Sequence, residues 1–322
     1  MASTTQSRRI GSAGIARGGS VPRFPSRIGS WELTRLVGEG LMSSLYEARA
    51  AGSSPTHAAA YAVKVLRPEW QDDSRGLAIL AREAQVGRLV SHSHLVPILA
   101  AGLSAPPYWV AMPLLEGQSL AEQLQAQPTL DLPVAIWIAR QVTEALAALH
   151  QAGWMHGDVK PSNVVVSSGG HATLVDLGFA RRTSERNAIA DRPILGTLHY
   201  IAPEVLYSAF GGDIRSDVYS LGVMLFEMFT GRLPFDADDV AELAALHRQE
   251  VPADVRNLAP HLPTRAARLI HHMLAKEPLR RPLPEEIVDR LASLEIETFA
   301  ERRSSLFGDD DRISPVVTGL DS

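Results

Sequence analysis

The sequence has no cysteine among its 322 residues. Disulfides, zinc fingers, iron–sulfur clusters and thiol catalysis are therefore excluded, and a cytoplasmic location is expected. An excess of positive charge is also absent, because the net charge is −5 and the isoelectric point is about 6.1. A general nucleic-acid-binding protein would be strongly basic, so no nucleic-acid partner is predicted. With 45% hydrophobic and 21% charged residues, the chain resembles an ordinary folded protein.

Lysine is scarce as well. Of the 31 basic residues, only Lys64, Lys160 and Lys276 are lysines, and the others are arginines. Arginine is a planar fork, whereas lysine is a compact point charge that reaches a single phosphate oxygen. Where arginine supplies nearly every positive charge, each remaining lysine is a candidate for a position that arginine cannot fill.

The two ends of the chain differ in composition from the part between them. Residues 1–30 carry five arginines and no acidic residue, which predicts a disordered basic tail. A transit peptide is similar in composition, but the glycine and proline content disfavours an amphipathic helix. Residues 299–322 are predicted to form a flexible polar tail. No signal-peptide core and no membrane span is predicted.

Hydrophobic patterning divides residues 31–298 into two parts. Residues 31–116 are predicted to be rich in strands (31–37, 60–66 and 108–115) with one helix (77–89). Residues 117–298 are predicted to be mostly helical. Their clearest elements are an amphipathic helix at 135–150, a hairpin of strands 164–166 and 172–175, and a buried apolar helix at 218–229.

Gly38 and Gly40 lie in a strand–turn–strand pattern. Glycine lets backbone amides approach phosphate oxygens, although an ordinary hairpin turn also favours glycine. A dinucleotide-binding loop is disfavoured, because Ser43 stands where a third glycine is needed and a strand follows. Lys64, in the next apolar strand, would hold a phosphate and pair with Glu83 on the following helix. A strand-end lysine that reaches water and a surface glutamate would explain the same two residues.

Asp158, Lys160 and Asn163 lie in one loop between the amphipathic helix and the hairpin. At this spacing they supply a base, a cation and a metal-ligating amide, although such residues also suit an ordinary turn. Asp176-Leu177-Gly178 ends the hairpin, and Asp176 lies on the side opposite Asn163. Carboxylate and amide oxygens suit Mg²⁺ rather than zinc.

Two close pairs stand out among the eleven histidines, His92-x-His94 and His271-His272. Histidines at such spacings can ligate a metal ion. Because no third ligand pattern accompanies either pair, packing at the surface or between lobes is favoured over metal binding.

Five motifs occur in one order along the chain: Gly38-x-Gly40, Ala62-Val63-Lys64, His156-Gly157-Asp158 with Lys160 and Asn163, Asp176-Leu177-Gly178, and Ala202-Pro203-Glu204. Together they resemble the motifs of protein kinases, most closely the bacterial serine/threonine kinases that are similar to eukaryotic ones. The resemblance implies an α+β bilobal fold over residues 31–298. It places a small β-rich N-lobe with one main helix at 31–116 and a larger, mostly helical C-lobe at 117–298.

The resemblance also implies a role for each matched residue. Asp158 accepts the proton of the substrate hydroxyl, Lys160 stabilises the transferring phosphate, and Lys64 holds ATP phosphates while paired with Glu83. Asn163 and Asp176 hold Mg²⁺, for which Mn²⁺ is an alternative. The other expected ATP contacts are Val37, Gly38, Glu39, Gly40, Leu45, Ala62, Met112, Pro113 and Leu115. The expected structural and activation-segment residues are Gly178, Thr197, Glu204, Asp217 and Arg281, with Asp217 bracing the catalytic loop and Glu204 paired with Arg281.

The implied reaction is transfer of the ATP γ-phosphate to Ser or Thr hydroxyls of protein substrates, autophosphorylation included. Lys160, two residues after Asp158, and Thr197 match the serine/threonine class rather than the tyrosine class. A pseudokinase, which binds nucleotide as a scaffold without transferring phosphate, is the alternative.

Three residues depart from the family pattern. Gly157 replaces the arginine that usually receives an activation-loop phosphate, which suggests that activity does not need phosphorylation at Thr183 or Ser184. Ser43 replaces the third glycine and is small enough for the loop to close. Gly87 interrupts the helix of Glu83 and suggests a mobile helix, because glycine in a helix costs about 0.5–1 kcal/mol relative to alanine.

Overall fold

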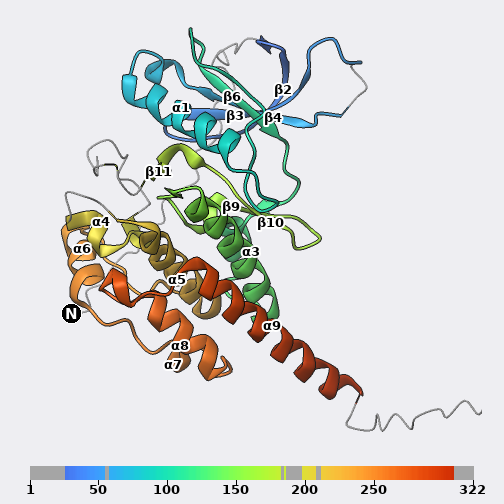
Figure 1. Cartoon of the computed structure of the whole chain (residues 1–322). Coiled ribbons are helices and arrows are strands. Elements are labelled where there is room, and N and C mark those ends of the chain that lie inside the picture. Colours follow the sequence, from blue (N-terminus) through green and yellow to red (C-terminus); the bar gives the residue numbers. More distant parts are fainter. Residues whose placement is uncertain (1–25, 55–57, 183–184, 186–197, 208–211, 308–322) are drawn as a thin grey trace, which may run out of the picture.

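The computed structural model describes residues 26–54, 58–182, 185, 198–207 and 212–307. They form a small lobe built around a β-sheet and a larger lobe built mostly of helices (Figure 1). The α+β bilobal fold expected from the sequence is confirmed.

The small lobe contains a six-stranded antiparallel sheet in the order β1-β2-β3-β4-β6-β5. Its strands are β1 (Arg27–Ile28), β2 (Trp31–Glu39), β3 (Ser43–Ala50), β4 (Tyr61–Leu66), β5 (Ala100–Gly102) and β6 (Trp109–Pro113). Helix α1 (Ser74–Leu89) begins after Asp73, whose carboxylate accepts a hydrogen bond from the Arg75 amide. The helix packs against β4 and β6. The predicted strands and helix are found, with ends that differ by a few residues.

The larger lobe is organised around α5 (Ile214–Thr230), of which nearly every residue is buried. It packs against α3 (Leu132–Gln151) and α8 (Thr264–Met273), and α3 lies along α9 (Pro284–Phe307) (Figure 1). Further helices are α2 (Leu120–Ala126), α4 (Pro203–Tyr207), α6 (Val240–Gln249) and α7 (Val255–Leu258). Short strands form two small sheets: β7 (Gln118–Ser119), β9 (Val164–Val166) and β10 (Ala172–Leu174) in one, and β8 (Trp154–Met155) and β11 (Arg181–Arg182) in the other. The predicted hairpin is the β9–β10 pair.

One helix in the described part of the chain, α3, is long and apolar enough to cross a membrane. More than half of its most apolar stretch, 56%, is buried inside the protein. The elements that cover it are α5, α9, β8 and β10. The apolar character of α3 is therefore accounted for by its place in the core of the larger lobe.

Both predicted tails extend too far into the folded region. Arg27–Ile28 forms β1, which pairs with β2, and Ile28 is only 3% exposed. At the other end, α9 continues to Phe307, beyond the predicted boundary at residue 298. A two-residue strand buries too little apolar surface to be visible in a pattern, and helix ends are weakly specified. Residues 1–25 and 308–322 lie outside the described residues.

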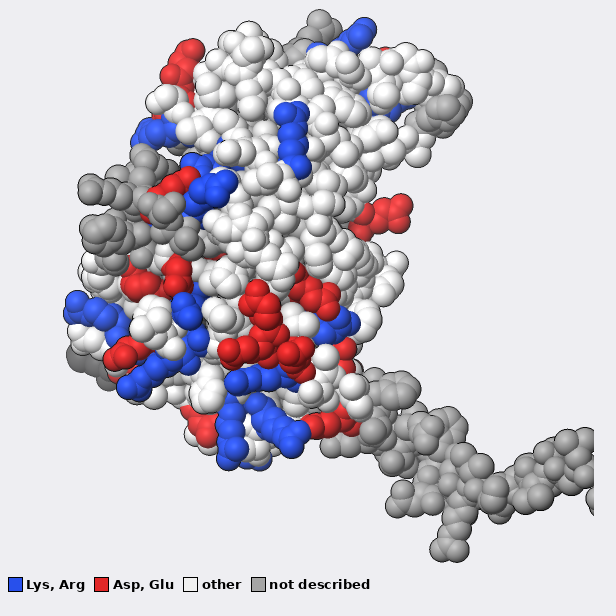
Figure 2. All heavy atoms as spheres, in the orientation of Figure 1, with Lys and Arg blue, Asp and Glu red and all other residues white. Residues whose placement is uncertain are grey.

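Charged side chains of both signs are interspersed on the larger lobe, as the face drawn in Figure 2 shows. Some charged residues of this lobe form ion pairs between helices. Arg140 on α3, for example, pairs with Glu144 one turn along and with Glu295 on α9 at 2.8 Å. These contacts hold α9 along α3, on the side of the lobe away from the small-lobe sheet (Figure 1).

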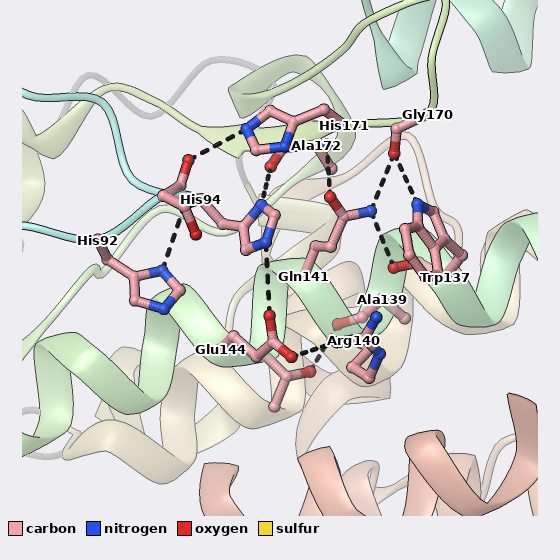
Figure 3. Close-up of polar contacts among 12 residues, drawn as sticks. His92, His94, Trp137, Ala139, Arg140, Gln141, Glu144, Gly170, His171 and Ala172 are labelled. Carbon is pink, nitrogen blue, oxygen red and sulfur yellow. Dashed lines mark hydrogen bonds and ion pairs between the residues drawn. The ribbon is translucent and has the colours of Figure 1, made fainter.

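The loop after α1 is hydrogen-bonded to β10 of the larger lobe. Val96 N donates to Leu174 O at 3.0 Å, and Leu174 N donates to His94 O at 2.8 Å. The ring of His94 lies between His92 and His171, with Nδ1 2.8 Å from Ala172 O (Figure 3). No group of three or more His, Asp or Glu within the described ranges is arranged to hold a metal ion. The three rings lie in contact where the loop after α1 meets the β9–β10 hairpin, and His171 Nε2 lies 3.1 Å from Ser93 O.

Close packing explains why position 87 is a glycine, which the sequence did not reveal. A Cβ at this position would lie 2.5 Å from Ile98 Cγ1 and 3.2 Å from Ile98 N. Ile98 N also donates to Gly87 O at 3.0 Å. The glycine therefore lets the loop before β5 pass close to α1, and helix mobility is not needed to explain it.

Gly87→Ala is accordingly expected to lower the free energy of unfolding by about 1–3 kcal/mol, the usual cost of overpacking. Helix propensity alone predicts the opposite sign. Urea denaturation measures the change. Gly169→Ala is the control, because a Cβ there meets only Ser167 Oγ, at 3.9 Å. Equal or higher stability of Gly87→Ala would show that Ile98 moves aside without cost.

His247, on α6, is buried and uncharged. Burial, reinforced by the charge of Lys276, lowers its pKa from 6.5 to about 3. Its Nδ1 lies 2.9 Å from the Tyr219 hydroxyl, while Nε2 is buried without a partner in the described structure. Protonation would therefore place a charge in a site that cannot solvate it.

Because the unfolded chain takes up this proton near pH 6.5 and the folded chain does not, stability is expected to fall as the pH drops below 6.5. The slope for this one histidine is up to about 1.4 kcal/mol per pH unit. Unfolding free energies between pH 7 and pH 5.5 measure it, and His247→Asn should flatten the dependence. The exposed His261, changed to asparagine, is the control. An unchanged slope in His247→Asn would refute the assignment.

Candidate active site

A cleft of about 240 Å³ lies between the two lobes. The glycine loop, α1, the loop after β8 and the segment after β10 all contribute to its walls. Among the lining residues are six predicted from the sequence, namely Gly40, Lys64, Glu83, Asp158, Lys160 and Asp176. Residues from both lobes therefore converge on one volume.

Lys64, on β4, sits between two carboxylates. Its Nζ lies 2.9 Å from Glu83 Oε2 on α1 and 2.9 Å from Asp176 Oδ1. Burial opposes the charge of Lys64, but the two carboxylates outweigh it and raise the pKa above its usual value. Burial likewise opposes ionisation of Asp176, yet Lys64 lowers its pKa. Lys64 and Asp176 are therefore both charged. The ammonium group of Lys64 could also form an ion pair with a phosphate group of a ligand.

The backbone around Asp176 is shaped to present this carboxylate. Asp176 has φ 66° and ψ 70°, a left-handed conformation that is uncommon for a residue other than glycine. Such conformations concentrate at functional sites. Two residues later, a Cβ on Gly178 would lie 2.6 Å from Ile79 Cγ2 of α1. Gly178 thus allows α1 to pack directly on the Asp176 segment.

Asp158 lies in the loop after β8 with its side chain 4% exposed. Its Oδ2 accepts hydrogen bonds from Lys160 Nζ at 2.8 Å and from Asn163 Nδ2 at 2.9 Å. Its Oδ1 is buried and has no partner within the described residues. An unpaired buried carboxylate oxygen is costly, and it is the atom expected to receive a hydroxyl proton from a substrate.

Asp217, near the start of the buried helix α5, holds the loop of Asp158 in place. Its carboxylate accepts from His156 N at 2.6 Å and from Gly157 N at 2.8 Å. Gly157 has φ 81°, which a side chain tolerates poorly. His156 Nε2 lies 3.0 Å from Val175 O. The loop is therefore fixed both to α5 and to the segment that leads to Asp176.

The glycine loop joins β2 to β3. Gly38 pairs with Leu45 across the strands, and Gly40 N donates to Ser43 O at 2.8 Å. Neither glycine has a positive φ, and a Cβ on Gly38 would meet nothing within 4 Å. The fold itself therefore does not require glycine here, whereas close approach of a ligand to the backbone does. Val37, beside them, is 45% exposed, and Glu39 ends β2.

The other predicted ATP contacts lie on β3, β4 and β6 and in the chain just after β6. Leu45 is the cross-strand partner of Lys64, and Ala62 is the partner of Met112. Ala62 and Met112 are buried, at 4% and 8% exposed. Pro113 ends β6 and Leu115 follows it. None of these five residues is among those that line the 240 Å³ cleft, so their contact with ATP stays a prediction.

The residues expected to stabilise the fold lie away from the cleft. Glu204 on α4 forms a two-pronged ion pair with Arg281, at 2.6 and 2.9 Å. Lys276, the third lysine, donates to His247 O at 2.8 Å at the end of α6 and stands 4.0 Å from the Phe235 ring. It therefore caps a helix and does not reach the cleft. Thr197 lies outside the described residues, as do Thr183 and Ser184.

Two features of the site have no counterpart among the sequence predictions. A second hollow of about 450 Å³ adjoins Lys160, between α2 and the end of α5, and Glu227 lines it. Tyr200 donates to Glu227 at 2.6 Å. In addition, Arg82 contacts Glu185 in the segment after β11. Both contacts join residues far apart in the sequence, so no local pattern could indicate them.

No group of three or more His, Asp or Glu in the described part of the chain could hold a metal ion alone. Asn163 and Asp176 nevertheless offer an amide oxygen and a carboxylate, since the Asn163 nitrogen is engaged by Asp158. Mg²⁺ commonly takes one or two such protein ligands and completes its coordination with water and phosphate. The donor set therefore fits Mg²⁺ bound together with a nucleotide.

A two-lobed fold with a lysine–carboxylate pair, a buried catalytic-loop aspartate and two oxygen ligands defines a protein kinase domain. A model of the protein kinase domain family matches residues 31–291. This chain therefore belongs to the protein kinase family, whose members use ATP and a divalent metal ion.

Curated bacterial relatives agree with this assignment. The chain is 34% identical over 266 residues to the serine/threonine-protein kinase PknD of Mycobacterium tuberculosis, covering 81% of this chain and 39% of the relative. It is 31% identical over 255 residues to the serine/threonine-protein kinase PrkC of Bacillus subtilis, covering 79% and 38%. A probable serine/threonine-protein kinase of Clostridium perfringens is 29% identical over 289 residues, covering 89% and 42%. The chain spans about two fifths of the length of these relatives.

Proposed function

We propose that this chain is a serine/threonine protein kinase that transfers the γ-phosphate of ATP to hydroxyl groups of protein substrates. The observation that carries the proposal is the buried, unpaired Oδ1 of Asp158, in a cleft that also contains Lys160 and the Lys64–Glu83 pair. The names of the bacterial relatives support the Ser/Thr class.

In the proposed reaction, the substrate hydroxyl oxygen attacks the γ-phosphorus. A new oxygen–phosphorus bond forms, the bond to the β–γ bridging oxygen breaks, and ADP leaves. Asp158 Oδ1 orients the hydroxyl and accepts its proton, while Lys160 neutralises charge on the transferring group. Lys64, held by Glu83, binds the α- and β-phosphates. Mg²⁺, for which Mn²⁺ is the alternative, would be held by Asn163 and Asp176 and would neutralise phosphate charge.

The hollow beside Lys160 is the proposed place for the substrate chain. At about 450 Å³ it adjoins the catalytic loop and opens beside Tyr200 and Glu227. A polypeptide there would bring a Ser or Thr side chain toward Asp158. We further propose a cytoplasmic location, and protein rather than nucleic-acid substrates. We also propose that α3, the one helix in the described residues long and apolar enough to cross a membrane, does not do so, because other elements cover it.

Incubation of the purified chain with labelled ATP, MgCl₂ and a generic basic protein tests the proposal. Label on Ser or Thr is expected, together with loss of transfer in excess EDTA and its recovery on addition of Mg²⁺. A chain that binds Mg·ATP but labels neither itself nor the substrate would instead be a nucleotide-binding scaffold. Label on tyrosine alone would overturn the assigned class.

A further inference from the structure

One ion pair joins α1 to the segment that follows β11. Arg82 Nη1 lies 2.7 Å from Glu185 Oε1 and 2.8 Å from Oε2, so both carboxylate oxygens meet one guanidinium nitrogen. The amide of Glu185 donates to Arg182 O at 3.0 Å. The backbone of Glu185 is therefore tied to the end of β11, and its carboxylate reaches across to α1.

Arg82 stands next to Glu83, the partner of Lys64. Its guanidinium also lies 5.3 Å from the ring centre of Trp154, and Arg182 lies 4.7 Å from the same ring. Trp154 belongs to β8, which pairs with β11 and leads into the loop of Asp158. The ion pair thus connects the helix that orients Lys64 to the strands that carry the catalytic loop.

At this junction a carboxylate already pairs with Arg82. Gly157, directly before Asp158, has no side chain and therefore supplies no positive charge. In the described structure, Arg82 and Arg182 are the cations that lie over the Trp154 ring. A carboxylate carries a single charge, which the two-oxygen contact with Arg82 neutralises.

We propose that Glu185 is a positioning residue that anchors α1 through Arg82, so that Glu83 meets Lys64 without a phosphate between Asp176 and Glu204. This inference rests on the proposed kinase function and names how that site is kept assembled. The two side chains are 30% and 36% exposed, and solvent screens such a pair. The expected effect of breaking it is therefore about three- to tenfold in kcat/KM, rather than complete loss.

Kinetics of single and paired variants of the full chain test the anchor. Glu185→Gln and Arg82→Gln are each expected to raise KM for Mg·ATP and lower kcat/KM about three- to tenfold. Arg82→Glu combined with Glu185→Arg should recover most of the loss, which a residue serving only general stability would not do. Arg88→Gln, an exposed arginine on the same helix, is the matched control and should behave as wild type.

A Thr183→Ala/Ser184→Ala double variant should keep wild-type activity, because no phosphate is needed there. Wild-type kinetics in Glu185→Gln, failure of the exchanged pair to recover activity, or loss of activity in the double variant would each overturn the anchor. An inactive wild type would contradict the proposed function instead. In that event, binding of a fluorescent ATP analogue decides: weaker binding by Glu185→Gln supports the anchor, and equal binding refutes it.

Discussion

Asp158→Asn is expected to slow phosphoryl transfer by on the order of 10³-fold while Mg·ATP still binds. Asparagine keeps the size of the side chain and an oxygen for Lys160, which lies 2.8 Å away, but it carries no charge and does not accept a proton near neutral pH. A positioned general base contributes roughly 10²–10⁴-fold. The measurements are kcat with labelled ATP and a basic protein, and Kd for a fluorescent ATP analogue.

Asp238→Asn makes the same chemical change at an exposed position on the larger lobe and should leave both quantities unaltered. Transfer at the wild-type rate by Asp158→Asn would place the base elsewhere. A loss of nucleotide binding as large as the loss of rate would show that Asp158 serves binding instead of proton transfer.

The residues expected to carry chemistry could be predicted from the sequence because phosphoryl transfer restricts their identity and spacing. Lys64 and Lys160 stand out in a chain where arginine supplies nearly all positive charge. The structure places Glu83 and Asp176 each 2.9 Å from Lys64. The third lysine, Lys276, shows the limit of that argument, because it caps the end of a helix and does not reach the cleft.

Other features depend on contacts that no short segment specifies. Gly87 is small because Ile98 passes beside it after a turn of the chain. Arg82 and Glu185 are partners only because β11 returns to β8. Ile28 is buried only once β1 has paired with β2. In each case the three-dimensional neighbour, and not the local pattern, determines the role of the residue.

The reason for Gly38 and Gly40 was open in the sequence, because hairpin turns and phosphate loops both favour glycine. In the structure neither has a positive φ, a Cβ on Gly38 would meet nothing within 4 Å, and one on Gly40 would meet Ser43 O at 3.5 Å, so the turn conformation does not itself demand glycine. What distinguishes the two explanations is therefore the conformation of the loop, which a motif alone does not contain.

Arg281→Ala is expected to lower the free energy of unfolding by about 3–5 kcal/mol, the usual cost of breaking a buried ion pair. The Arg281 side chain is fully buried and also donates to Ala275 O at 2.7 Å, Arg215 O at 3.0 Å and Lys276 O at 3.1 Å. Alanine would leave those carbonyls without this donor, and the Ser216 hydroxyl, at 2.6 Å, would be the remaining side-chain donor to the Glu204 carboxylate in the described structure. For a domain of this size, the melting temperature should fall by roughly 10 °C, as measured by calorimetry.

Arg280→Ala removes the same type of side chain one residue earlier, where it is 76% exposed and lies 3.7 Å from Glu277. It should change stability by no more than about 0.5 kcal/mol. Because Glu204 ends the segment that begins at Asp176, Arg281→Ala should also reduce activity below the new melting temperature, whereas Arg280→Ala should not. Equal stability of the two variants would mean that Glu204 finds another partner, and the ion pair would then not be what holds α4 against α5.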